Sequence, residues 1–193
     1  MCLITTQNKS GSGSAVDKFL RQRPFPLSLH KLRSLPDVDP YIKQVLSEIR
    51  IRRWKISTKC AQYNFQVLEQ GGWQQVVGYL GELLSQRSQE PDSHHYILER
   101  EATHAVKELL KGLGPKQSRN FWQDLYVTRY EIPLDSRVLR WIKANLGFYV
   151  PSSGLSDERF YCQVMDIIRD LCLEAGILPC MFDAAIFSSF EPE

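Results

Sequence analysis

The segment from Leu110 to Lys116, Leu-Lys-Gly-Leu-Gly-Pro-Lys, constrains the fold more than any other stretch of this chain. Apolar residues recur with helical period just before it, which predicts an amphipathic helix over 99–111 with Gly112 at its left-handed C-cap. Pro115 suits the first position of a second helix, because its missing N–H would have had no partner there. The sequence therefore predicts two helices joined by a glycine hairpin, a motif that spans about 99–125.

The second glycine of this hairpin, Gly114, allows either an unusual backbone angle or the close approach of a ligand. A hairpin of this kind points free backbone N–H groups at one spot, and such a spot binds a phosphate. An ordinary helix–loop–helix joint without a ligand is the alternative that the spacing leaves open.

A carboxylate follows the hairpin at a defined distance, because Asp135 lies 19 residues after Lys116 and directly follows Ile132-Pro133-Leu134. An amine at a helix start, paired with this carboxylate, is a candidate for covalent chemistry on DNA. Each residue also has a simpler explanation. Lys116 could contact a phosphate, and Asp135 could cap the helix that follows it.

The run Gly112-Leu113-Gly114-Pro115-Lys116, together with Pro133-Leu134-Asp135, resembles the signature of the helix-hairpin-helix DNA glycosylase superfamily. Leu3 to Asn8 and Ser14 to Val16 resemble the family's first core helix and the loop that enters the duplex. The nearest members are the short 8-oxoguanine glycosylases without an iron–sulfur cluster. The resemblance implies one all-α domain over 1–193, and Met1 falls where that first core helix is already under way, so part of the usual N-terminal region is expected to be missing.

The resemblance also implies an activity in base excision repair. A bifunctional DNA glycosylase and AP lyase would remove an oxidised base, with 8-oxoguanine as the expected one. Lys116 would attack C1′ of the flipped nucleotide and form a Schiff base that permits strand cleavage. The positive end of the helix dipole opposes a cation at Lys116 and so favours the neutral amine. Asp135 would stabilise the positive charge on the sugar.

Further site residues follow from the same resemblance. Residues expected to contact DNA come from the hairpin and from the N-terminal segment: Gly112, Leu113, Gly114, Gln7 and Asn8. Residues expected to line the base pocket are Asn120, Asp183 and Phe187. Phe187 fits a hydrophobic core equally well, and the family often has tryptophan at its place. Two other functions remain open, a helix-hairpin-helix module that binds DNA without catalysis and a monofunctional alkylpurine glycosylase.

Composition permits this function without requiring it. The chain has 193 residues and a formal net charge of +2, so a DNA-binding surface would have to be local. The densest basic cluster surrounds Trp54 and consists of Arg50, Arg52, Arg53, Lys55 and Lys59. This cluster could lie on phosphates, or it could be a solvated helix start.

The cysteines and histidines predict no metal and no cofactor. Cys162, Cys172 and Cys180 are spaced too widely for an iron–sulfur cluster. We expect them to be reduced and mostly buried, and the histidines lack the spacing of a zinc site. The expected partner is double-stranded DNA with a damaged base, bound by a monomer. No signal peptide or membrane-spanning run is visible, which predicts an intracellular, cytoplasmic protein, nucleoid-associated in a bacterium or archaeon.

Helical periodicity in nearly every segment, without sustained alternation, predicts an all-α fold. Asp39, Ser57 and Ser156 are the expected N-caps of three helices. The helix after Ser156 is expected to turn five apolar side chains inward: Phe160, Val164, Ile167, Ile168 and Leu171.

Overall fold

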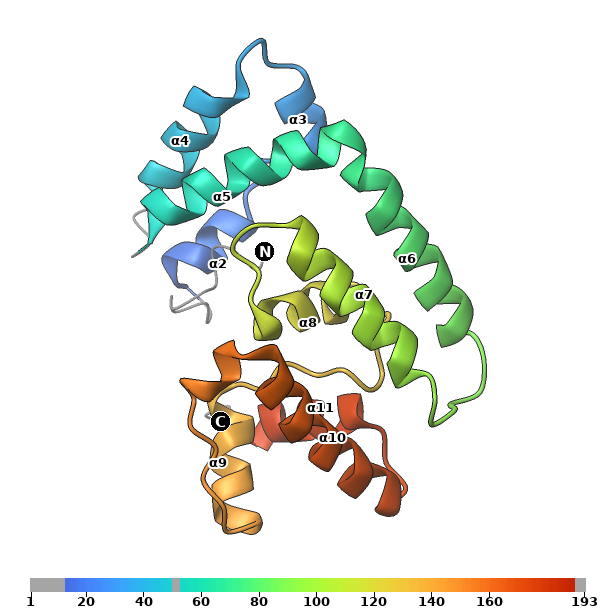
Figure 1. The fold of residues 1–193 in the computed structure, drawn as a ribbon. Coiled ribbons are helices and arrows are strands. Elements are labelled where there is room, and N and C mark those ends of the chain that lie inside the picture. The colour runs from blue at the N-terminus through green and yellow to red at the C-terminus, as the bar shows by residue number, and fades with distance from the viewer. Residues whose placement is uncertain (1–12, 50–52, 190–193) are drawn as a thin grey trace. The chain divides into compact units, whose positions relative to one another are not determined.

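The computed structural model describes residues 13–49 and 53–189, and this part of the chain is helical with no strand (Figure 1). The prediction of an all-α fold is therefore confirmed. The α-helices are α2 (Ala15–Leu20), α3 (Leu29–Arg33), α4 (Val38–Glu48), α5 (Trp54–Val67), α6 (Trp73–Arg87), α7 (Tyr96–Leu109), α8 (Pro115–Gln123), α9 (Ser136–Asn145), α10 (Glu158–Glu174) and α11 (Pro179–Ser189). A π-helical turn, η1 (Leu68–Gly72), and a 3-10 turn, η2 (Gly154–Ser156), complete the set.

The chain divides into two compact units, each with its own core. The first extends to Trp73 and includes Glu108–Leu113, and the second comprises Gln74–Lys107 and the chain from Gly114 onward. A single domain over 1–193 stays a prediction. Among the described helices, none alone is long and apolar enough to cross a membrane, and α10 with α11 would meet that test only as a pair bent by 96°.

In the first unit, α4 packs against α5 over a small apolar core. Its buried members are Val16, Phe19, Leu32, Ile42 and Leu46. The helical backbone is interrupted between α5 and α6, where Gly71 has a φ of +116°. Only glycine adopts this angle readily, so the break predicted at Gly71-Gly72 is confirmed.

Three of the expected N-caps are wrong by one to four residues. Asp37, rather than Asp39, caps α4 and accepts a hydrogen bond from the N–H of Asp39 at 3.1 Å. Asp157, rather than Ser156, caps α10. At α4 both candidates are carboxylates, and the earlier one caps the helix. At α10 the Asp157 carboxylate attracts the first-turn N–H groups more strongly than the Ser156 hydroxyl does. Helix α5 begins at Trp54, which packs on the core, so Ser57 lies buried inside the helix.

The core of the second unit lies among α9, α10 and α11, drawn in orange to red in Figure 1. The prediction for the inner face of α10 is confirmed in part, because Val164 and Ile168 are buried and Phe160 packs against the core. The buried residues of α10 are Tyr161, Val164, Met165, Ile168 and Cys172, whereas Ile167 and Leu171 are 45% and 38% exposed. Tyr161 explains the rotation, because its hydroxyl donates to the Ile132 carbonyl (3.2 Å) and accepts from the Leu134 N–H (2.6 Å). The same bonds fix the backbone just before Asp135.

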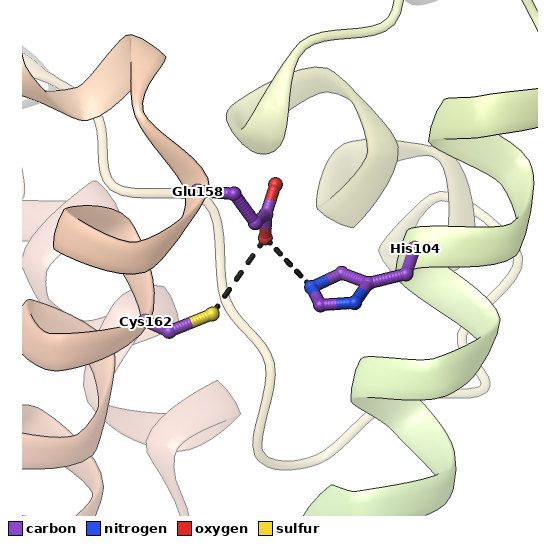
Figure 2. Close-up of side chains that lie close together, drawn as sticks. All are labelled: His104, Glu158 and Cys162. Atoms are coloured by element: carbon purple, nitrogen blue, oxygen red, sulfur yellow. Dashed lines mark hydrogen bonds and ion pairs between the residues drawn. The ribbon is translucent and has the colours of Figure 1, made fainter.

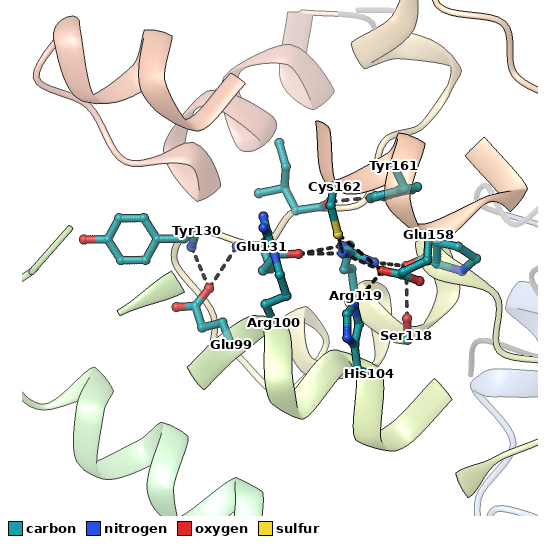
Figure 3. A network of polar contacts seen from close by, with 12 residues as sticks. Glu99, Arg100, His104, Ser118, Arg119, Tyr130, Glu131, Glu158, Tyr161 and Cys162 are labelled. Atoms are coloured by element: carbon teal, nitrogen blue, oxygen red, sulfur yellow. Dashed lines mark hydrogen bonds and ion pairs between the residues drawn. The ribbon is translucent and has the colours of Figure 1, made fainter. Parts of the chain in front are cut away.

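A buried ionic network joins α7, α8 and α10 (Figure 3). Arg119, with no exposed side-chain surface, binds Glu131 at 2.7 Å and Glu158 at 3.0 Å. Arg100 adds contacts of 2.8 Å to Glu131 and 2.6 Å to Asp166. Removing one partner from such a network leaves an uncompensated buried charge, which costs about 3–5 kcal/mol. The network therefore holds the helix that carries Lys116 in a fixed place within the second unit.

Glu99 positions the segment that follows α8. Its side chain is buried, and its two oxygens accept hydrogen bonds from the N–H groups of Arg129, Tyr130 and Glu131 at 2.7 to 2.9 Å. Burial raises the pKa of Glu99 to about 7, and the three N–H groups only partly offset this rise.

We expect the contribution of Glu99 to the free energy of unfolding to fall as the pH rises from about 4.5 to about 7. In that range folded Glu99 keeps a proton that the unfolded chain releases, so the unfolded state binds fewer protons. The loss should approach about 3 kcal/mol for this group. Urea unfolding at several pH values, with Glu99→Gln as the reference, checks it. A difference between the two proteins that does not change with pH would contradict the assignment.

Candidate active site

The predicted hairpin is present between α7, which ends at Leu109, and α8, which begins at Pro115. Gly112 has a φ of +85°, which confirms the left-handed turn expected there. Gly114 has an ordinary extended conformation (φ −84°, ψ −176°), so the unusual angle considered for it is wrong. A Cβ built at Gly114 would meet nothing within 4 Å, and the residue is exposed. Gly114 is the N-cap of α8, a position that suits glycine, and the open space beside it would also admit a ligand.

Two side chains hold the hairpin at its ends. In the first unit, the buried Asn64 accepts from the Lys111 N–H at 2.8 Å and donates to the Lys111 carbonyl at 3.0 Å. In the second unit, the hydroxyl of Ser118 lies 3.1 Å from the Gly114 carbonyl and 3.0 Å from that of Pro115. Each end of the hairpin is therefore held by a contact within its own unit, and Gly114 is exposed.

Lys116 is the second residue of α8 and is half-buried, as the sequence predicts for the first turn. Asp135 caps α9, and its Oδ1 accepts from the N–H groups of Arg137 (2.8 Å) and Val138 (3.1 Å). This confirms the predicted capping role. The second oxygen, Oδ2, binds the Arg137 guanidinium at 2.7 Å. Burial alone would raise the pKa of Asp135, but Arg137 and the two N–H groups hold it below its usual value, so the carboxylate is ionised at neutral pH.

Asp183 of α11 connects these groups. Its Oδ2 accepts a hydrogen bond from the side-chain amide of Gln123 at 2.8 Å. Burial raises the pKa of Asp183, the Gln123 bond and the charges of Arg137 and Lys116 lower it, and the charge of Asp135 raises it. Lys116, Asp135 and Arg137 thus lie close enough to act on one carboxyl group. Helices α8, α9 and α11 bring them together from distant parts of the sequence.

The other two residues expected in the base pocket, Phe187 and Asn120, do not contact Asp183 in any described bond. Phe187 is 45% exposed, and Ile186 faces the core in its place, so the alternative of a core Phe187 is wrong. The Arg137 guanidinium lies 3.8 Å from the centre of the Phe187 ring. Asn120 donates to Gln117 at 3.3 Å, and no described contact joins it to Asp183. Gln7 and Asn8 lie outside the described residues.

Gln123 and Arg137 belong to the site but were not among the residues that the sequence predicted. A signal for Gln123 existed, because residues 116, 120 and 123 follow helical spacing and therefore share one face of α8. Arg137 gave no such signal. Its guanidinium contacts the ring of Phe187, which lies 50 residues later in the chain.

A second cluster, His104, Glu158 and Cys162, could offer three ligand atoms within 4.8 Å of one another (Figure 2). His104 Nε2 lies 3.0 Å and Cys162 Sγ 3.6 Å from Oε1 of Glu158. Arg119 binds the same oxygen at 3.0 Å, and Lys107 lies 3.6 Å from Oε2. Burial raises the pKa of the Cys162 thiol. The positive charges of Arg119 and Lys107 would repel a metal ion, and they already compensate Glu158. The cluster therefore fits an ion-pair network better than a metal centre.

The other cysteines and the basic cluster show a mixed outcome. Cys60, Cys162, Cys172 and Cys180 are free thiols, but only Cys172 is buried, so the expectation that the late cysteines are mostly buried is wrong for two of the three. In the basic cluster, Lys55 and Lys59 are exposed on the first turns of α5, whereas Arg50 and Arg52 lie outside the described residues.

Comparison of the chain with protein-family models, with curated proteins and with solved structures finds no match in any of the three.

Proposed function

We propose that this chain is a bifunctional DNA glycosylase and AP lyase of the helix-hairpin-helix superfamily. Its proposed substrate is an oxidised purine, with 8-oxoguanine as the expected one. One observation carries the proposal: the elements that carry Lys116, Asp135 and Asp183 are in contact. Gln123 of α8 donates to Asp183 of α11 at 2.8 Å. Arg137, paired with Asp135 at 2.7 Å, lies 3.8 Å from the ring of Phe187 on α11. A lysine amine, an ionised carboxylate and a second carboxyl group in one place are the groups that this reaction needs.

The reaction follows from these groups. The Lys116 ammonium first gives up a proton to solvent. The resulting amine donates its electron pair to C1′, and the bond from C1′ to the base breaks, with its electrons leaving on the base, which takes up a proton. The amine nitrogen loses a proton as the sugar ring opens to a Schiff base. Loss of the C2′ proton then expels the 3′ phosphate and cuts the strand. Asp135 lowers the barrier because its negative charge opposes the positive charge that develops on the sugar.

The surroundings of the carboxylates suit a base that has left the duplex. The exposed ring of Phe187 offers an apolar face on which a flipped base could stack, and Asp183, bonded to Gln123, lies one turn earlier on α11. A carboxylate accepts hydrogen bonds from N–H groups, and guanine-type bases present N–H donors along one edge. This combination favours a purine with such donors over an alkylated adenine.

The open face of Gly114 is the proposed contact for the DNA backbone. We expect Gly114→Val to lower the affinity for duplex DNA about tenfold, because its side chain would fill the space that a phosphate needs. The fold should be retained, since the backbone angle suits any residue and the space is empty, although valine is a poorer N-cap than glycine and should cost about 1 kcal/mol. Titration of labelled duplex at several salt concentrations, together with the thermal midpoint, checks both statements.

Gly81→Val is the matched control, because Gly81 in α6 also has nothing within 4 Å of a built Cβ. It should leave DNA affinity unchanged. If Gly114→Val binds duplex as well as the wild type does, with the same salt dependence, the hairpin is not the anchor.

The activity is tested with a panel of duplexes that carry 8-oxoguanine, an oxidised pyrimidine, an alkylated purine or an abasic site. We expect free 8-oxoguanine and a cut strand from the first duplex, and an intact unmodified duplex. Release of only the alkylated purine, without strand cleavage, would identify a monofunctional enzyme. Binding to all duplexes without any release would identify a non-catalytic module.

A further inference from the structure

Arg137 joins two parts of the site that the proposed reaction uses separately. Its Nε and Nη2 lie 2.8 and 2.7 Å from Oδ2 of Asp135, and its guanidinium carbon lies 3.8 Å from the centre of the Phe187 ring. The Arg137 side chain is 28% exposed, and Phe187 is 45% exposed. The guanidinium therefore covers one face of an aromatic ring at the surface while it neutralises the carboxylate.

Both contacts conflict with the proposed reaction as they stand. A base that stacks on this face of Phe187 needs the space that the guanidinium occupies, because each lies within about 4 Å of the ring. The ion pair also weakens the field of Asp135 at a developing sugar cation. The arrangement without DNA is thus one in which the stacking surface is covered and the carboxylate is compensated.

We propose that Arg137 is a positioning residue that couples recognition of the base to activation of Asp135. A base that stacks on Phe187 displaces the guanidinium from the ring, and this movement loosens the ion pair and exposes the charge of Asp135 to the sugar. An abasic sugar brings no base and leaves the guanidinium on the ring. This inference rests on the proposed function, because it takes Phe187 as the stacking surface and Asp135 as the stabilising charge.

The size of the effect follows from the contact that must break. A cation–π contact at a partly exposed site changes an equilibrium by roughly 3- to 30-fold. Removing the guanidinium should therefore tighten binding of a stacked base by that factor. Binding of an abasic site should not gain, since no base competes for the ring. A contact between Arg137 and a phosphate would change both affinities alike, so the ratio of the two affinities isolates the coupling.

The experiment uses Lys116→Gln protein, in which binding is measured without turnover. Dissociation constants are determined for a duplex with 8-oxoguanine and for one with a tetrahydrofuran abasic analogue. Adding Arg137→Gln should shift their ratio 3- to 30-fold in favour of the base. Arg137→Lys should shift it in the same direction, because it keeps the charge but lacks the planar group that covers the ring.

Two comparisons make the result specific. Arg140→Gln removes the same charge from an exposed position of α9 and should leave the ratio unchanged. In a Phe187→Leu background the ring is gone, so adding Arg137→Gln should change nothing further. A preference for 8-oxoguanine that is present but unaffected by Arg137→Gln and Arg137→Lys would overturn the coupling alone. No preference for either modified duplex over an unmodified one would overturn the proposed function, and the coupling with it.

Discussion

Lys116→Gln should abolish covalent capture on DNA and reduce base release at least a thousandfold, while the variant still binds damaged duplex. The glutamine amide keeps the polarity of the side chain but has no electron pair free to form a Schiff base. A thousandfold loss corresponds to about 4 kcal/mol of the activation barrier. Single-turnover assays on an 8-oxoguanine duplex measure the rate, and a binding titration measures the affinity.

Lys116→Arg separates catalysis from phosphate binding. Arginine keeps the positive charge and binds phosphate well, but its guanidinium is always protonated and cannot attack. It should be as inactive as the glutamine variant. Lys143→Gln, which removes an exposed lysine of α9, should behave as the wild type does. Activity close to that of the wild type in Lys116→Arg would make Lys116 a phosphate contact.

Asp135→Asn should slow base release by about three orders of magnitude with little change in DNA affinity. The substitution removes the negative charge opposite the developing sugar cation, an interaction realised mainly in the transition state. Asparagine is also a good N-cap, so the bonds to the N–H groups of Arg137 and Val138 can be retained. The pKa of Asp135 lies below its usual value, so the wild-type rate should not depend on protonation of this group near neutral pH.

Asp157→Asn provides the matched control for Asp135→Asn. Asp157 caps α10 and accepts from the Phe160 N–H at 2.9 Å, so the same change occurs at a helix start outside the site. Any loss of stability from exchanging the cap bonds should be similar in the two variants, and Asp135→Asn should lose in addition the ion pair with Arg137. If both slow base release equally, the effect of Asp135 is structural, and the proposed electrostatic role is wrong.

The local features of the site were accessible from the sequence because short-range rules determine them. A glycine at a left-handed turn, a proline at a helix start and an aspartate before a helix each depend on a few neighbouring residues. Gly112, Pro115 and Asp135 lie where these rules place them. The misplaced caps of α4 and α10 are cases in which two neighbours could both cap the same helix, whereas α5 begins without a side-chain cap bond.

Contacts between distant residues were not accessible in this way. Gln123 and Asp183 are 60 positions apart, and no periodic pattern relates them. The buried charged residues could not be predicted either, because charged side chains such as Glu99 and Arg119 are expected at the surface. In the folded chain three N–H groups surround Glu99, and two carboxylates surround Arg119. The prediction for α10 was wrong at Ile167 and Leu171 for the same reason. The bonds of Tyr161 to a distant loop decide which face turns inward.

The central claim is that Lys116 forms a covalent bond with the sugar of a damaged nucleotide. Borohydride reduction of the wild-type protein with a duplex that carries 8-oxoguanine tests it most directly, because reduction converts a Schiff base into a stable adduct. We predict a protein–DNA adduct that requires the lesion, with Lys116 as the modified residue in peptide mass spectrometry. An adduct on another residue, or none with oxidised purines, oxidised pyrimidines and abasic sites alike, would contradict the account.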